Sequence, residues 1–137
     1  MGFEMNIEFG NLNYRFKKKP LLVGGKAMEF YGLRKAGEDI DFIVTKDDYD
    51  QLAKQYPNNL KNIFGDKGVC VINFEIWKSI RWHVYEELIH NAIEENDYLV
   101  ISLEKLLLLK ALAMSIPKYH DDLELIVAKI SKTEPKK

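Results

Sequence analysis

Two short motifs in the first third of the chain carry residue types that bind phosphate and divalent metals. Gly24 and Gly25 follow an apolar run at residues 21–23, and Asp39 and Asp41 flank a single apolar residue. A glycine turn lets the backbone approach a ligand closely, and a helix starting there offers free N–H groups to a phosphate. Strand side chains alternate, so both aspartates project from one face, and Mg²⁺ prefers such oxygen ligands. We therefore expect a Mg²⁺ or Mn²⁺ site on Asp39 and Asp41 beside a phosphate-binding turn at Gly24 and Gly25.

Each motif has an ordinary explanation when it is taken alone. A Gly-Gly pair after a strand is a common turn, and an Asp-x-Asp pattern at a strand edge usually faces solvent. The conjunction is more specific, because the one helix between the motifs can bring the turn and the carboxylates to the same end of a small sheet. Two carboxylates held close together also repel each other, which costs stability without a cation.

Further side chains suit a nucleotide site, and each has a structural alternative. Lys110 lies in a largely apolar segment, where burying an unpaired ammonium is costly. The structural explanation is that Lys110 pairs with a carboxylate or extends to the surface. The functional alternative is that it contacts a phosphate or the substrate. Arg34 reaches a phosphate or ends a solvated helix. Trp77 and Trp82 could stack a base, although core packing or simple surface exposure is the more frequent explanation.

The hydrophobic pattern predicts the elements that position these residues. The predicted strands are residues 21–23, 40–44, 69–77 and 99–101, and the predicted helices are residues 26–34, 47–56, 103–115 and 120–130. Thr45 and Ser102 are the expected helix caps, and residues 84–96 fit either a helix or a strand. This order predicts an α/β (α+β) fold, with a small mixed sheet flanked by helices and a helical C-terminal part.

Composition indicates one globular domain, residues 1–137, with about 1–19 and 131–137 peripheral. Hydrophobic residues make up 47% of the chain and charged residues 30%. The net charge of −1 provides no general attraction to nucleic acid or membrane, so phosphate binding must be local. Cys70 is the single cysteine, which excludes an intrachain disulfide. We expect a cytoplasmic protein with neither a membrane nor a DNA partner.

The string GGKAMEFYGLRKAGEDIDFIV, residues 24–44, resembles the signature of the DNA polymerase beta-type nucleotidyltransferase superfamily. That signature is an apolar residue, Gly followed by Gly or Ser, a spacer, and an acid-apolar-acid triplet. The aromatic-Gly-x-Arg element at residues 31–34 is closer still to the minimal nucleotidyltransferases of toxin-antitoxin and abortive-infection systems. The resemblance covers residues 21–45 closely and the C-terminal helices more loosely.

The resemblance implies a nucleotidyltransferase fold and the transfer of a nucleoside monophosphate from an NTP to a protein or RNA acceptor. It also implies an antitoxin protein as a partner. By the resemblance, Asp39 and Asp41 hold two Mg²⁺ ions, of which one activates the attacking oxygen and the other stabilises the departing pyrophosphate. A third acid on a later strand is usual in the superfamily. Glu75 is the candidate catalytic and metal-binding third acid, with an exposed edge carboxylate as the alternative.

The same branch carries a lysine in its long apolar helix, which Lys110 matches, and a basic-x-Lys-Asp element that opens the last helix. Residues 118–121 match that element in part, because Lys118 stands where arginine is common and His120 where lysine is usual. The residues expected to bind the nucleotide are therefore Gly24, Gly25, Lys26, Arg34, Lys110 and Lys118.

Two other interpretations remain open. One is a non-catalytic domain of the same fold with a binding or regulatory role, which the altered basic element and the short chain favour. The other is a generic α/β domain in which the motif is coincidental. The coincidental interpretation would follow if Gly25 and Asp39 lay at opposite ends of the sheet.

Overall fold

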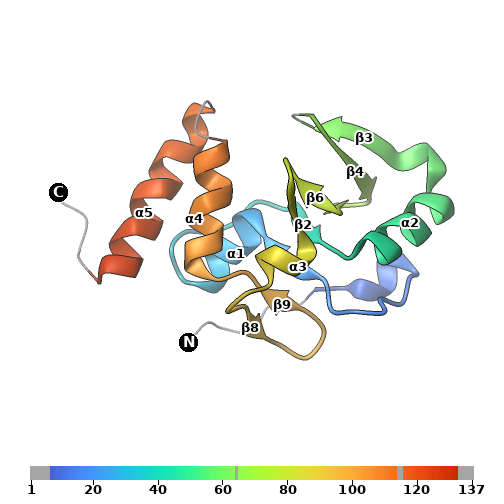
Figure 1. The fold of residues 1–137 in the computed structure, drawn as a ribbon, viewed down its shortest axis with the longest axis horizontal. Helices are drawn as coiled ribbons and strands as arrows, with labels where there is room; N and C mark the ends of the chain where they lie inside the picture. The colour runs from blue at the N-terminus through green and yellow to red at the C-terminus, as the bar shows by residue number, and fades with distance from the viewer. Residues whose placement is uncertain (1–6, 64, 114–115, 133–137) are drawn as a thin grey trace.

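The structure is a computed structural model that describes residues 7–63, 65–113 and 116–132 (Figure 1). Its described residues form a mixed seven-stranded sheet in the order β3-β4-β5-β2-β1-β9-β8. At the centre, β2 runs antiparallel to β1 and parallel to β5, and β1 runs parallel to β9. The sheet strands are β1 (Leu21–Val23), β2 (Ile40–Ile43), β3 (Leu60–Ile63), β4 (Asp66–Val71), β5 (Phe74–Trp77), β8 (Ile93–Glu94) and β9 (Leu99–Val100). A separate antiparallel pair consists of β6 (Ser79–Ile80) and β7 (His83–Val84).

Five α-helices in the described residues complete the α+β architecture that the sequence predicts. They are α1 (Gly24–Phe30), α2 (Lys46–Gln55), α3 (Tyr85–Leu88), α4 (Leu103–Leu112) and α5 (His120–Ser131). Short 3₁₀ helices are η1 (Phe9–Leu12), η2 (Pro57–Asn59) and η3 (Pro117–Tyr119). Both predicted caps are confirmed, because the side chain of Thr45 accepts from the Asp48 N–H and that of Ser102 accepts from the Lys105 N–H.

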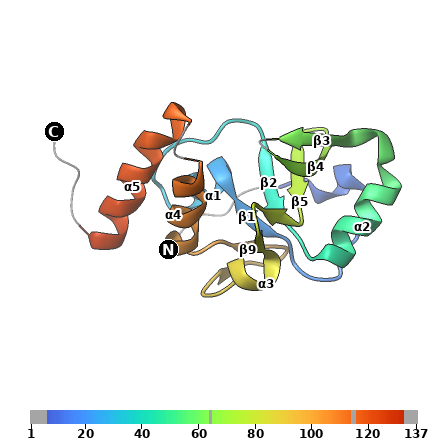
Figure 2. The same ribbon diagram turned by 45° about the horizontal axis from the view of Figure 1, so that its top comes forward.

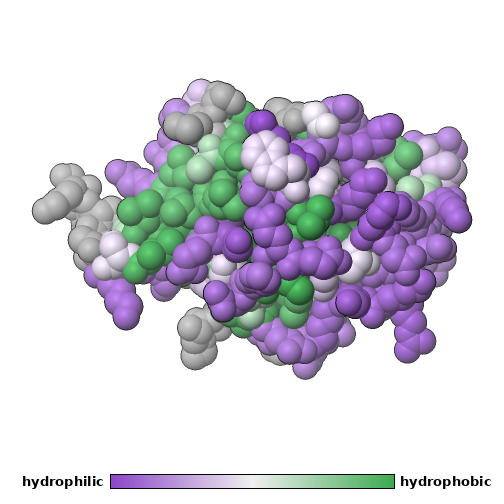
Figure 3. Space-filling view, viewed as in Figure 1, coloured by the Kyte–Doolittle hydropathy of each residue, from purple (hydrophilic) through white to green (hydrophobic). Residues whose placement is uncertain are grey.

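The helices divide between the two ends of the molecule. The packed pair α4 and α5 lies at one end, and α2 lies with the β3–β4 hairpin at the other (Figure 2). Helix α1 packs against β1 and β2. Hydrophobic residues gather on the surface over α4 and α5 (Figure 3). None of the helices in the described residues combines the length and apolar character needed to cross a membrane.

The core forms where the central strands meet α1, α2 and α4. Strands β1 and β2 are apolar at nearly every position, because other strands or helices cover both their faces. Fully buried side chains include Leu21, Leu22, Met28, Phe42, Ile43, Leu52, Phe74, Ile76, Ile101 and Leu106. Leu12 is also fully buried, which ties the N-terminal segment into this core.

The prediction of one long strand over residues 69–77 is wrong, because the chain turns back within it. Residues 69–71 end β4 and residues 74–77 form β5, with Val71 opposite Phe74. Ile72 takes a left-handed φ of 57° at the turn and is 72% exposed. One continuous strand would also place Val71 and Glu75 on the same face, which is wrong. Glu75 shares a face with its cross-strand partner Cys70 and not with Val71.

Other predicted boundaries differ by a few residues. The first helix starts at Gly24 and ends at Phe30, earlier than the predicted 26–34, and a turn covers the rest. Helix α4 ends at Leu112, and residues 114–115 of the predicted helix lie outside the described residues. Strand β3 was not predicted, because three of its four residues are exposed and it carries no alternating apolar pattern. The ambiguous residues 84–96 contain α3 and β8.

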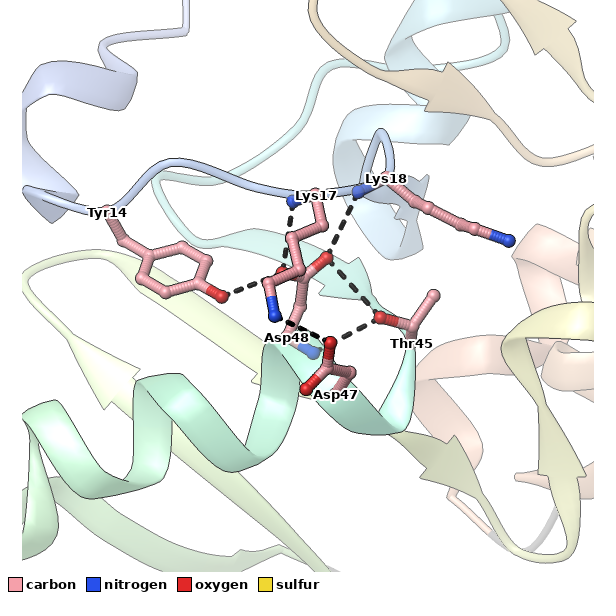
Figure 4. Close-up of polar contacts among 6 residues, drawn as sticks. All are labelled: Tyr14, Lys17, Lys18, Thr45, Asp47 and Asp48. Carbon is pink, nitrogen blue, oxygen red and sulfur yellow. Dashed lines mark hydrogen bonds and ion pairs between the residues drawn. The ribbon is translucent and has the colours of Figure 1, made fainter.

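A buried carboxylate joins the N-terminal segment to α2. Asp48 is fully buried, and its oxygens accept from the Tyr14 hydroxyl at 2.7 Å and from the Thr45 hydroxyl at 3.3 Å (Figure 4). The backbone N–H groups of Lys17 and Lys18 donate to the same carboxylate at 3.1 and 3.2 Å. With four donors, this carboxylate is fully satisfied and has a structural explanation.

Candidate functional site

Three acidic side chains come together on one face of the central strands. Asp41 of β2 pairs in register with Glu75 of β5, so the two side chains lie side by side. Asp39 precedes Asp41 by two residues, which places it on the same face of the extended chain. The expected contribution of Glu75 to the carboxylate group therefore has a geometric basis, even though the strand that carries it was predicted incorrectly.

The glycine turn lies directly against this group. Gly24 has a φ of 67°, and a Cβ atom placed on it would overlap Oδ2 of Asp41. A larger residue does not fit here, since the close approach leaves no room for a Cβ atom and the positive φ adds backbone strain to any side chain. The two motifs thus lie at the same end of the sheet, and Gly25 and Asp39 line one cavity. The opposite placement, which would have established a coincidental motif, is not what the structure has.

The environment of Asp41 disfavours its negative charge. Burial raises the pKa of the Asp41 carboxyl to about 8. The charge of Glu75, a hydrogen bond with Glu75 and the charge of Asp39 act in the same direction, while Lys110 opposes them. Oδ1 of Asp41 is also buried without a hydrogen-bond partner. A buried acceptor of this kind calls for a proton, a donor or a cation.

Two basic side chains face the carboxylates from the opposite wall. Arg34 donates to both oxygens of Asp122, from Nε at 2.6 Å and from Nη2 at 2.9 Å. Nζ of Lys110 lies 2.9 Å from Oδ2 of Asp122 and 4.3 Å from the centre of the Tyr119 ring. This ion-paired triad joins α4, α5 and the segment after α1.

The triad is desolvated, which perturbs its titration. Lys110 is only 6% exposed. Burial lowers the pKa of its ammonium, although the hydrogen bond with Asp122 opposes that shift. Burial alone would raise the pKa of Asp122, but Arg34 and Lys110 hold it below its usual value. The open interpretation of Lys110 is thus answered in part, because it pairs with a carboxylate while it also lines the cavity.

One cavity of about 800 Å³ collects most of the predicted site residues. Its lining runs from the glycine turn, past the carboxylates, to the β3–β4 hairpin and the C-terminal end of α4. The predicted residues in the lining are Gly24, Gly25, Arg34, Asp39, Asp41, Glu75 and Lys110. Lys26 is described but is not a lining residue, and the side chain of Lys118 lies outside what the structure describes.

The carboxylates supply part of the oxygen ligand set that a divalent cation takes in proteins. No three His, Cys, Asp or Glu side chains converge as a complete metal-binding group within the described residues. Mg²⁺ commonly takes only one or two carboxylates and completes its shell with phosphate oxygens and water. The unpartnered Oδ1 of Asp41 and the nearby charges of Asp39 and Glu75 match that donor set.

The sequence interpretation did not assign Asp122 to the site. The bond that Asp122 accepts from Arg34 spans 88 positions in sequence, and no local pattern signals such a contact. Trp77 was expected mainly in the core, with base stacking as the alternative. It is buried and lines the cavity, and its Nε1 atom has no partner.

Comparisons of the chain with protein-family models, with curated proteins and with solved structures find no match. The functional interpretation therefore starts from the side chains that line the cavity.

Proposed function

We propose that this chain is a metal-dependent nucleotidyltransferase that moves a nucleoside monophosphate from an NTP to a hydroxyl on a protein or RNA acceptor. The observation that supports it is the shared lining of one cavity. Three carboxylates, a glycine turn with no side chains and two basic side chains all face the same 800 Å³ space. Phosphoryl transfer needs little beyond such positioning and charge neutralisation.

Each part of the cavity has a role in this proposal. Asp39, Asp41 and Glu75 hold Mg²⁺ or Mn²⁺, and the bound metal neutralises charge on the triphosphate. The backbone at Gly25 lies against the phosphates, and Arg34 with Lys110 contacts their oxygens. The acceptor oxygen forms a bond to the α-phosphorus as the bond to the β-phosphate oxygen breaks. Pyrophosphate leaves, and the hydroxyl proton passes to water.

A second candidate is a binding or regulatory domain with the same cavity and no transfer activity. The ion-paired state of Arg34 and Lys110 favours it, because both basic groups already pair with Asp122. An NTP must compete with that carboxylate for them. In this alternative the cavity binds a nucleotide, and no product forms.

Two measurements test the proposal. Thermal unfolding is followed with each NTP and Mg²⁺ or Mn²⁺; an NTP at 100 times its Kd should add about 2.7 kcal/mol, or roughly 8–10 °C in Tm. Transfer of label from α-³²P NTPs to cell lysate then reports activity and the acceptor. The double variant Asp39→Asn, Asp41→Asn should lose both signals, whereas Asp97→Asn, the same change at an exposed carboxylate, should keep them.

The outcomes separate the candidates. A thermal shift with labelled product supports the transferase, and a thermal shift without product in any lysate supports the binding domain. Absence of a shift with every NTP at millimolar concentration, with either metal, contradicts the proposed nucleotide site. Unchanged NTP affinity in the double variant contradicts the assignment of the carboxylates.

A further inference from the structure

Two buried polar side-chain atoms in the described residues lack a hydrogen-bond partner, and both belong to residues that line the cavity. They are Oδ1 of Asp41, an acceptor, and Nε1 of Trp77, a donor. The proposed metal accounts for the first. Nothing in the proposed transfer uses the second, and a buried N–H without an acceptor destabilises the folded state. The indole therefore marks a part of the cavity that still needs an explanation.

Trp77 stands next to the carboxylates along the strand. Trp77 pairs with Ile43, two residues along the strands from the Asp41–Glu75 pair. Its side chain therefore lies on the same face of the sheet as Asp41 and Glu75. Two residues of strand correspond to about 7 Å. The indole therefore lies about the length of one ribose from the place where the metal and the α-phosphate would lie. It lies on the side of the carboxylates nearer to the β3–β4 hairpin.

The surroundings of the indole form a slot with apolar walls. Gly68 of β4 lies under the ring, where a Cβ atom would come within 2.6 Å of Nε1. Apolar side chains line the same cavity: Ile63 of β3, Ile80 of β6, Leu112 at the end of α4 and Ile116 beyond it. Such a slot suits a flat and largely apolar group.

Arg81 closes one side of the slot by bridging its two walls. Its backbone N–H donates to both carboxylate oxygens of Asp66 on β4, at 3.0 and 3.1 Å. Its guanidinium donates to the Leu112 carbonyl at the end of α4, at 3.2 Å. These contacts tie the turn between β6 and β7 to β4 and to the end of α4.

We propose that this slot binds the nucleobase of the NTP, with Nε1 of Trp77 donating a hydrogen bond to an acceptor atom on the edge of the base. The inference rests on the proposed nucleotidyltransferase function and names how its substrate is recognised. A nucleobase offers a flat face to the apolar walls and has ring-nitrogen or carbonyl acceptors on its edge. Because Nε1 is buried in this structure, entry of the base must shift the indole.

Tryptophan fluorescence tests this directly, because the chain contains only Trp77 and Trp82. Trp82 is 71% exposed and is not among the lining residues, so the Trp82→Phe protein reports on Trp77 alone. We expect Mg²⁺-NTP to change the emission of Trp77 in this protein. Mg²⁺-tripolyphosphate, which has the phosphates without a base, should bind without that change.

Matched affinity measurements complete the test. Trp77→Phe keeps an aromatic ring and removes the N–H, so NTP affinity should fall about 3- to 10-fold while tripolyphosphate affinity stays within 2-fold. Trp82→Phe is the same substitution at an exposed ring and should change neither affinity. Circular dichroism and thermal unfolding confirm that each variant is folded. If Trp77→Phe does not fold, the fluorescence of the Trp82→Phe protein alone decides.

The outcomes distinguish this inference from the function on which it depends. Equal effects of Trp77→Phe on NTP and tripolyphosphate, or an unchanged Trp77 emission with bound NTP, overturn the base slot and leave the transferase proposal standing. An emission change that requires an acceptor and not the NTP assigns the slot to the acceptor and also overturns the inference. If the wild-type protein binds neither NTP nor tripolyphosphate with Mg²⁺, the proposed function and the base slot both fail.

Discussion

Removing the titration of Asp41 should stabilise the metal-free protein at neutral pH, and the size of the gain follows from its raised pKa. The folded state holds this carboxyl at a pKa of about 8, while an unfolded aspartate titrates near 3.9. Between these values the folded state binds a proton that the unfolded state has lost. The free energy of unfolding therefore falls as the pH rises through this window, by up to about 1.4 kcal/mol per pH unit.

The Asp41→Asn variant removes this dependence, because a neutral amide of the same shape takes the place of the protonated acid. Its free energy of unfolding should exceed that of the wild type by roughly 2–4 kcal/mol at pH 7, with little difference below pH 4. Urea unfolding at pH 4, 5, 6, 7 and 8 with EDTA measures both proteins. Asp97→Asn at an exposed site is the control and should follow the wild-type pH profile.

The coupling of Asp41 to its neighbour sharpens the test. Glu75 contributes to the raised pKa by its charge and by a hydrogen bond, so the proton belongs to the carboxylate group as a whole. Glu75→Gln should recover part of the same free energy, and the double variant should gain less than the sum of the single changes. An Asp41→Asn protein that is less stable than the wild type at pH 7 and 8 without metal would refute this account of the site.

Three further changes have clear expected results. Asp48→Asn presents an amide NH₂ to backbone donors and should lower the free energy of unfolding by about 2–4 kcal/mol in urea titrations; an unchanged value contradicts the buried network. Asp122→Asn leaves Lys110 buried without its countercharge and should lower the free energy of unfolding by about 3–5 kcal/mol in the same titrations. A gain in stability would show that the ion pair is not needed. Gly24→Ala should abolish Mg²⁺-NTP binding by calorimetry, since its Cβ displaces the Asp41 carboxylate, and full binding would separate the turn from the site.

The local features of the fold were predictable where side-chain chemistry decides the backbone. Thr45 and Ser102 each satisfy a free N–H at the start of a helix, and this preference is strong enough to read from sequence. The alternation of strand side chains on either side of Ile40 predicted that Asp39 and Asp41 lie on the same face. The relation of Gly24 to Asp41 was also predictable in outline, because a strand, a short helix and an adjacent strand return the chain to the same end of the sheet.

The remaining features depend on conformations or contacts that leave no local pattern. Ile72 occupies a left-handed turn position, where glycine or asparagine is the usual signal, so the β4–β5 hairpin looked like one continuous strand. The bidentate bond from Arg34 to Asp122 joins residues whose sequence neighbourhoods give no sign of each other. Trp77 has the hydrophobicity of a core residue, and only the assembled sheet shows that its N–H lacks a partner.

Asp48 and Asp41 show why the cavity is better explained by a ligand than by packing. Asp48 is fully buried, and four donors within the protein satisfy its carboxylate, so the fold alone accounts for it. Asp41 has a buried oxygen with no partner, and Trp77 has a buried N–H with none. Unsatisfied buried groups would be scattered if they were incidental. Here both residues line one cavity, which is expected where a bound ligand supplies the missing partners.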